Sequence, residues 1–131
     1  MRLLFDTNIL IVLARGELGK LTGNMASAVT STENVAFASA ASLWEIAIKA
    51  RLRKIEPGLP LDELPDYLRE IGLNLLVIDH RHAVRSVDPE PATRDPFDRL
   101  LLAQCAVEQL QLVTLDRVLG SHPLAWSEGN R

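Results

Sequence analysis

The sequence predicts a three-layer α/β/α fold with a central, mostly parallel sheet. Short apolar runs alternate with helical patterns along the chain, and an acidic residue directly follows several of the runs. Strands that alternate with helices form parallel sheets covered on both faces. The chain has 131 residues, of which 47% are hydrophobic. This suits one buried core, so we expect a single domain over residues 1–131.

The first half of the chain contains two predicted strands and three predicted helices. The expected strands are 2–5 and 35–38, and the expected helices are about 9–15, 21–30 and 42–52. Thr7 and Asn8 offer side-chain caps for the first helix. Ser42 and Glu45 have the spacing of a capping box, which predicts the start of the third helix.

The second half repeats the pattern of strand, acidic residue and helix. The expected helices are about 62–71, 80–86 and 96–109, and the expected strands are 73–78, 112–115 and 124–126. Asp95 and Pro96 are a strong helix start, because proline is favoured at the first helical position. Asp79 and Asp116 end strands and precede short helices.

Composition excludes several classes of protein. The apolar runs are far shorter than the roughly 18 residues of a membrane span. Asp6 and Asn8 interrupt the N-terminal apolar run that a signal peptide would need. We therefore expect a cytoplasmic protein without membrane association. A single cysteine, Cys105, excludes disulfide scaffolds and zinc ribbons. A net charge of −3 argues against a protein that coats nucleic acid electrostatically.

The histidines and the glycine-rich segment carry no catalytic pattern. His80 and His82 are two positions apart and do not share a helical face, and His122 precedes a proline. We expect solvated surface histidines. The segment 16–22, GELGKLT, lacks the spacing of a phosphate-binding loop.

Five acidic residues are predicted to meet at the carboxyl edge of the sheet. Asp6 and Asp116 follow strands, whereas Glu45, Asp95 and Asp98 lie in the first turns of two helices. Each has a structural explanation, since acids cap helices, complement the helix dipole and begin turns. Together they also predict a cation site, because clustered carboxylates repel one another unless a cation compensates them.

The predicted ligands indicate which cation this would be. They are all oxygen atoms, and the sequence has neither a cysteine pair nor a His-x-x-x-His spacing. Such a site suits Mg²⁺, with Mn²⁺ as a substitute, better than zinc. Two such ions about 4 Å apart can stabilise the attacking and leaving oxygens of phosphodiester hydrolysis. Cleavage of a nucleic-acid strand is therefore the leading hypothesis.

Four ordered segments carry these acids and resemble a known family. They are Leu4-Phe5-Asp6-Thr7-Asn8-Ile9-Leu10, Ser42-Leu43-Trp44-Glu45-Ile46 with Lys49, Asp95-Pro96-Phe97-Asp98-Arg99, and Val113-Thr114-Leu115-Asp116. The chain resembles the PIN-domain ribonucleases over nearly its whole length, and most closely the VapC-type toxins of type II toxin–antitoxin systems. The resemblance implies a PIN-like fold, a Mg²⁺-dependent endoribonuclease, a VapB-like antitoxin as partner, and a homodimer.

The resemblance also implies roles for individual residues. Asp6, Glu45, Asp98 and Asp116 match the family's acidic quartet. The three aspartates are expected to bind one Mg²⁺, and Glu45 to place a second ion or the attacking water. Attack by water would leave a 5′-phosphate and a 3′-hydroxyl.

The polar residues of the same motifs have two interpretations. Thr7, Asn8 and Thr114 either orient the carboxylates and water or only cap helices and strand ends. Asp95 is assigned to capping first, and a secondary role at the metal stays open.

Basic, aromatic and apolar residues suggest contacts with partners. Lys49 and Arg99 are candidate RNA contacts, whereas Arg51, Arg53 and Lys54 either complement a helix dipole or bind the RNA backbone. Trp44 and Phe97 either stack on a base or pack in the core, and core packing is favoured. An apolar groove for an antitoxin helix is expected around Leu10, Leu13, Leu18, Leu21, Leu43, Ala47 and Ala50, although interior packing explains these positions equally well.

Two alternatives to an RNA-cleaving toxin remain. One is a non-catalytic binding or regulatory module that keeps the fold; the complete set of acids argues against it. The other is a metal-dependent DNA nuclease or phosphatase that uses the same acids. RNA is preferred through the resemblance alone.

Overall fold

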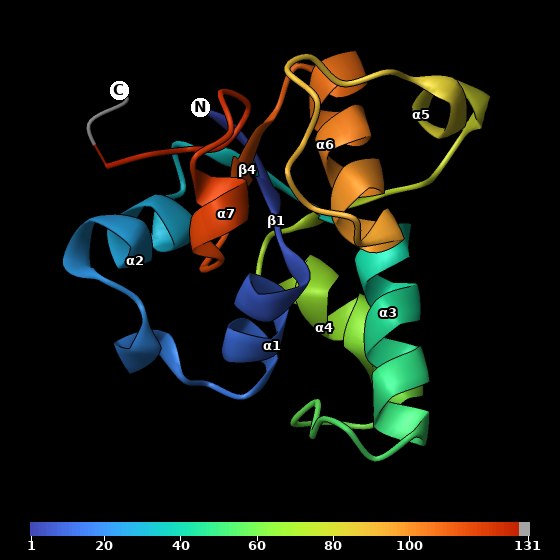
Figure 1. Cartoon of the computed structure of the whole chain (residues 1–131). Coiled ribbons are helices and arrows are strands. Elements are labelled where there is room, and N and C mark those ends of the chain that lie inside the picture. Colours follow the sequence, from blue (N-terminus) through green and yellow to red (C-terminus); the bar gives the residue numbers. More distant parts are fainter. Residues whose placement is uncertain (129–131) are drawn as a thin grey trace.

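A four-stranded parallel sheet lies at the centre of the computed structural model, which describes residues 1–128 (Figure 1). The strands are β1 (Arg2–Phe5), β2 (Val35–Ser39), β3 (Asn74–Leu76) and β4 (Gln111–Val113). Their order is β3-β2-β1-β4, and every pairing is parallel. The predicted parallel sheet is confirmed.

Helices cover both faces of the sheet, and the side chains of β1 show how the layers form. Leu3 and Phe5 pack into one apolar cluster and Leu4 into a second, because successive side chains of a strand point to opposite faces. The first cluster includes residues of α1 (Thr7–Ala14), α2 (Gly23–Thr30) and α4 (Leu64–Glu70). The second includes residues of α6 (Pro96–Glu108) and α7 (Arg117–Gly120). This is the expected three-layer arrangement.

The remaining helices connect these layers. They are α3 (Ala40–Arg51), α5 (His80–Val84) and two 3₁₀ turns, η1 (Leu18–Lys20) and η2 (Leu61–Glu63). α3 places Ile46 in the first apolar cluster and Ala41 in the second. It therefore lies against both layers, and its beginning is next to the first turn of α6 (Figure 1).

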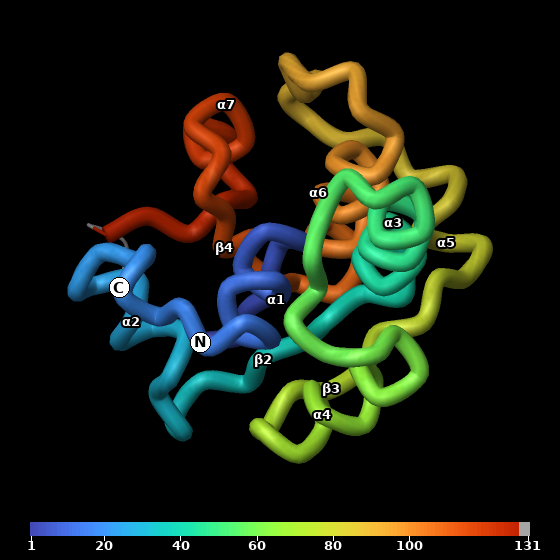
Figure 2. The backbone as a smooth tube through the Cα atoms, turned by 90° about the horizontal axis from the view of Figure 1, so that it is seen from below, coloured from blue at the N-terminus to red at the C-terminus, as the bar shows by residue number. Residues whose placement is uncertain are grey.

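The strand order creates a switch point between β1 and β4. From β1 the chain continues to β2 and β3 on one side, whereas β4 pairs with the other side of β1. Ligands of open α/β sheets bind outside the carboxyl ends of the strands at such a point. Figure 2 views the molecule from this side, with α1 near the middle, α3 and α6 on one flank, and α7 on the other.

Three predicted helix starts were wrong, and for α1 and α3 the reason is that the cap lies closer to the preceding strand. Asp6 caps α1 in place of Thr7 and Asn8, and Ser39 caps α3 by accepting a hydrogen bond from Ala41 N. Ser42 and Glu45 therefore lie inside α3 and form no capping box. The predicted helix 21–30 is preceded by η1 and begins after Thr22, which caps α2.

The later elements follow the prediction with shorter limits. The strand predicted over 73–78 is limited to β3, and the helix predicted over 62–71 is η2 followed by α4. The expected last strand is a single bridge between Leu112 and Ala125. Within residues 1–128, no helix is both long and apolar enough to span a membrane.

Candidate active site

Asp6 lies at the carboxyl end of β1 and is 4% exposed. Its Oδ1 accepts a hydrogen bond from Thr7 N at 2.7 Å, and its Oδ2 accepts one from Thr114 Oγ1 at 2.6 Å. Burial raises the pKa of Asp6, these hydrogen bonds oppose the rise, and the charges of Glu45 and Asp116 add to it. The carboxylate is thus held in one orientation beside other negative charges.

Glu45 points into the protein from the second turn of α3 and is 6% exposed. Its Oε1 accepts a hydrogen bond from Thr7 Oγ1 at 2.6 Å, and its Oε2 accepts one from Lys49 Nζ at 2.7 Å. Thr7 Oγ1 also lies 3.0 Å from Ser42 Oγ. Thr7 therefore joins the start of α1 to Glu45.

Asp95 and Asp98 have different surroundings at the start of α6. Asp95 caps the helix, since its Oδ1 accepts a hydrogen bond from Phe97 N at 2.9 Å. Asp98 Oδ2 accepts a hydrogen bond from Thr93 Oγ1 at 3.1 Å. Burial and then the charges of Asp95, Asp6 and Glu45 raise the pKa of Asp98 to about 6.

Asp116 follows β4 and is exposed. Its Oδ1 accepts hydrogen bonds from Val118 N at 2.8 Å and from Leu119 N at 3.1 Å, so it caps α7. The backbone N–H of Asp116 donates to Thr114 Oγ1 at 3.0 Å. Thr114 thus connects Asp116 to Asp6.

The fold gathers the five predicted acids at one edge of the sheet. Asp6 is affected by the charges of Glu45 and Asp116, and Asp98 by those of Asp95, Asp6 and Glu45. Capping accounts for three of these acids: Asp6, Asp95 and Asp116. It does not account for a buried Glu45 or for the environment of Asp98, so the group is more than a set of helix caps.

The comparison with protein families agrees with this arrangement. The PIN domain family matches residues 3–122. The chain belongs to the PIN-domain family. It is also similar to Ribonuclease VapC16 of Mycobacterium tuberculosis (strain ATCC 25618 / H37Rv), with 42% identity over 67 residues. That stretch is 50% of this chain and 48% of the relative, so the match spans about half the length of each.

The acids of this PIN domain have the chemistry to hold a divalent cation. All candidate ligands are carboxylate oxygens, which suit Mg²⁺ or Mn²⁺. Asp98 Oδ1 and Asp116 Oδ2 accept no hydrogen bond from any residue within 1–128. Both oxygens are therefore available to a cation, which would also compensate the negative charges that add to the effect of burial on the pKa of Asp6 and Asp98.

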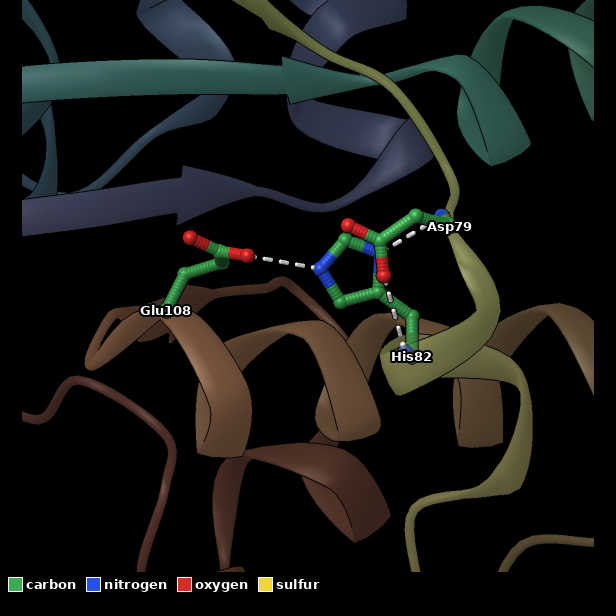
Figure 3. Close-up of side chains that lie close together, drawn as sticks. All are labelled: Asp79, His82 and Glu108. Carbon is green, nitrogen blue, oxygen red and sulfur yellow. Dashed lines mark hydrogen bonds and ion pairs between the residues drawn. The ribbon is translucent and has the colours of Figure 1, made fainter.

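A tighter group of ligand atoms lies elsewhere in the PIN domain and was not predicted. Among residues 1–128, Asp79, His82 and Glu108 place one ligand atom each within 4.8 Å of one another (Figure 3). Glu108 ends α6, which Asp95 begins. At 1.5 Å per helical residue, this group lies about 20 Å from Asp95.

Hydrogen bonds explain this second group without a metal. His82 Nδ1 accepts from Asp79 N at 3.0 Å, so Nε2 carries the proton and donates to Glu108 Oε2 at 2.8 Å. The guanidinium of Arg81 lies 2.8 Å from Asp79 Oδ2 and 2.9 Å from Glu108 Oε2. Both ring nitrogens and both carboxylates thus have partners, and the group fastens α5 to α6.

Two histidine predictions were wrong. His82 is 1% exposed and His122 is also buried, with Nε2 donating to Pro89 O at 2.9 Å. His80 is exposed, as expected. The spacing of Asp79 and His82, which form a capping box on α5, is the sequence signal that was overlooked.

The remaining residues predicted for the site differ in exposure and in contacts. Asn8 is exposed, and the Arg99 guanidinium contacts Glu90 and donates to Thr93 O at 3.0 Å. Trp44 is 62% exposed, which contradicts the expected core packing. Its ring meets that of Phe97 edge to face, with the ring centroids 5.7 Å apart. Phe97 itself packs partly against the second apolar cluster.

Proposed function

We propose that this PIN domain is a Mg²⁺-dependent endoribonuclease that hydrolyses RNA phosphodiester bonds, with Mn²⁺ as a possible substitute. The observation that carries the proposal is the set of acids at the switch point between β1 and β4, where burial and then the charges of neighbouring acids raise the pKa of Asp6 and Asp98. A relative whose name includes ribonuclease supports RNA as substrate.

In the proposed site, Asp6, Asp98 and Asp116 hold the ion and the threonines set the carboxylate orientations. Thr114 donates to Asp6 Oδ2 and thereby favours one orientation of that carboxylate. Thr7 does the same for Glu45. Asn8, exposed at the start of α1, is proposed to orient carboxylates or metal-bound water.

Hydrolysis needs a nucleophile and charge compensation at the phosphate. A bound Mg²⁺ would lower the pKa of the attacking water and neutralise the scissile phosphate. Glu45 is proposed to orient that water, because Thr7 and Lys49 hold its carboxylate and its charge acts on both Asp6 and Asp98. With water as nucleophile, the products carry a 5′-phosphate and a 3′-hydroxyl.

RNA would lie across the exposed rim of the site. The candidate contacts are the Lys49 ammonium, the edge-to-face pair of Trp44 and Phe97, and Arg99, whose guanidinium contacts Glu90 and Thr93 O. Unpaired RNA bases stack on aromatic side chains, and basic side chains bind phosphates. These four residues are the proposed RNA contacts.

A VapB-like antitoxin is the proposed protein partner. A cavity of about 480 Å³ lies among α1, α2 and α4. Leu13, Leu18, Val29 and Tyr67 form part of its apolar lining, and residues 30–32 and Asn34 add polar groups. An apolar antitoxin segment fits such a groove. Of the other positions predicted for the groove, Leu10 and Leu21 are buried in the core, and Leu43, Ala47 and Ala50 on α3 do not line this cavity. A cytoplasmic homodimer is the proposed state of the toxin.

The proposal is tested by incubating purified protein, separated from any antitoxin, with a structured RNA pool under Mg²⁺, Mn²⁺ or EDTA. Metal-dependent cleavage that Asp6→Asn abolishes is expected, with 5′-phosphate and 3′-hydroxyl ends. Parallel reactions with DNA and with a small phosphate ester test the alternative activities, a DNA nuclease and a phosphatase. Products with 2′,3′-cyclic phosphates, or cleavage that EDTA leaves unchanged, would contradict the mechanism.

A further inference from the structure

Lys49 holds the carboxylate of Glu45 from the next turn of α3. Its Nζ lies 2.7 Å from Glu45 Oε2, while Thr7 Oγ1 occupies the other oxygen at 2.6 Å. The Lys49 side chain is 43% exposed and that of Glu45 only 7%. Both oxygens of Glu45 therefore have donors, and one donor is a full positive charge.

This ion pair differs from an ordinary surface pair on a helix. A glutamate four residues before a lysine is a common stabilising arrangement, worth a few tenths of a kcal/mol when exposed. Here the carboxylate is buried, and the ammonium also lies within the field of Asp95 and Asp98 on another helix. Its contact with Glu45 and then the charges of these acids raise the pKa of Lys49. The lysine is thus a fixed cation of the acid cluster.

A fixed cation changes how many divalent ions the site can hold. Mg²⁺ or Mn²⁺ bound to Glu45 Oε2 would have to displace the ammonium or share one oxygen with it, and like charges at that distance repel. Asp98 Oδ1 and Asp116 Oδ2, by contrast, have no donor within residues 1–128. Asp6 also has donors on both oxygens, but both donors are neutral, so among these acids Glu45 is the one whose carboxylate is paired with a full positive charge.

We infer that Lys49 supplies the positive charge at Glu45 that a second divalent ion would otherwise supply, so that this domain binds one ion, at Asp6, Asp98 and Asp116. The inference rests on the proposed function and narrows the role of Glu45 to placing water. Because an ammonium has three N–H donors, Lys49 can hold Glu45 and still donate to an RNA phosphate. Lys49 is a positioning residue in this account.

The test counts Mn²⁺ ions bound to metal-free protein by the electron paramagnetic resonance signal of free Mn²⁺. Wild type should bind one ion per chain. Lys49→Met keeps the aliphatic stem and removes the charge, so Glu45 should become available and a second ion should bind. Adding Glu45→Gln to Lys49→Met should return the number to one. Circular dichroism checks that each variant is folded.

Two matched variants control for charge and for folding. Lys54→Gln removes a charge from an exposed residue just beyond the end of α3 and should leave one ion. Lys49→Arg keeps a cation at Glu45 and should also bind one, which keeps the inference testable if Lys49→Met fails to fold.

Two outcomes would overturn the inference while leaving RNA cleavage, and hence the proposed function, intact: two ions bound to wild type, or one ion bound to folded Lys49→Met. Two ions bound to folded Lys49→Arg would also overturn it, because the cation would then not exclude the second ion. Failure of wild type both to bind Mn²⁺ and to cleave RNA would overturn the inference and the proposed function together.

Discussion

The carboxyl group of Asp98 shows how burial and the charges of neighbouring acids together raise a pKa. Its pKa of about 6 lies above the value of 3.8 for an isolated aspartate. Between these two values the folded protein binds a proton at Asp98 more tightly than the unfolded chain does. Asp98 therefore contributes stability at low pH that is lost as pH rises through about 6.

Replacing Asp98 should raise thermal stability and at the same time abolish metal binding. At neutral pH in EDTA, Asp98→Asn removes a repelled charge, and we expect Tm to rise by about 2 °C after allowance for solvent screening. Bound Mn²⁺ should be lost, because a carboxamide lacks the charge that holds the ion. Thermal melts and Mn²⁺ titration measure both effects, and a lower Tm with unchanged Mn²⁺ binding would contradict this account.

The same pKa predicts how Mn²⁺ affinity depends on pH. Below about pH 6 a proton competes with the ion for Asp98, so the apparent affinity should fall by up to about tenfold per pH unit. Calorimetric titrations of wild type between pH 5 and pH 7.5 measure this slope. An affinity that stays constant across the range would show that Asp98 is not a ligand.

The sequence could predict which residue types gather at the site but not every contact between them. Asp6 and Asp116 follow recognisable strands, so their positions could be derived from the alternation of elements. Thr93 lies in an irregular loop, and nothing in its spacing indicates a contact with Asp98. The pairing of Lys49 with Glu45 is visible as an i, i+4 spacing. Only burial of the glutamate distinguishes it from a surface pair.

At the scale of elements, helix caps account for much of the acidic pattern. Asp95 is the clearest case, because its side chain accepts from Phe97 N and Pro96 occupies the first helical position. The sequence predicted this start correctly, since both signals are local. The caps of α1 and α3 were missed because each helix start offers more than one capping residue: Asp6, Thr7 and Asn8 near the start of α1, and Ser39 and Ser42 near the start of α3. The end of the preceding strand selects among them.

Substitutions of Asp95 distinguish a cap from a metal ligand. Asp95→Ala should lower the free energy of unfolding by about 1 kcal/mol, whereas Asp95→Asn should change it little because asparagine also caps well. Both variants should keep Mn²⁺ binding if capping is the main role. Urea denaturation and Mn²⁺ titration provide the two measurements, and loss of the ion in a stable Asp95→Asn would assign the residue to the metal.

At the scale of the whole molecule, the sheet order decides where the acids meet. The alternation of strands and helices predicts a parallel sheet, yet it does not say on which side of β1 each later strand is added. That order depends on how the helices pack on the two faces of the sheet around β1. Local sequence patterns do not predict such long-range packing. The strand order places β4 beside β1, where Asp6 N donates to Val113 O at 2.9 Å.

The hydrogen-bonded group of Asp79, Arg81, His82 and Glu108, which links α5 to α6, should contribute to stability but not to metal binding or RNA cleavage. Glu108→Gln removes the carboxylate that pairs with His82 and Arg81, and we expect a loss of about 1–2 kcal/mol in the free energy of unfolding. Mn²⁺ stoichiometry and RNA cleavage by the folded protein should not change. An altered stoichiometry in Glu108→Gln would give this group a part in metal binding.

The central claim, that a divalent ion binds at the switch point of the sheet, is tested most directly by locating Mn²⁺ in crystals through its anomalous scattering. We predict one peak in contact with carboxylate oxygens of Asp6, Asp98 and Asp116. A peak at Asp79, His82 and Glu108, with none at the carboxyl ends of β1 and β4, would contradict the account.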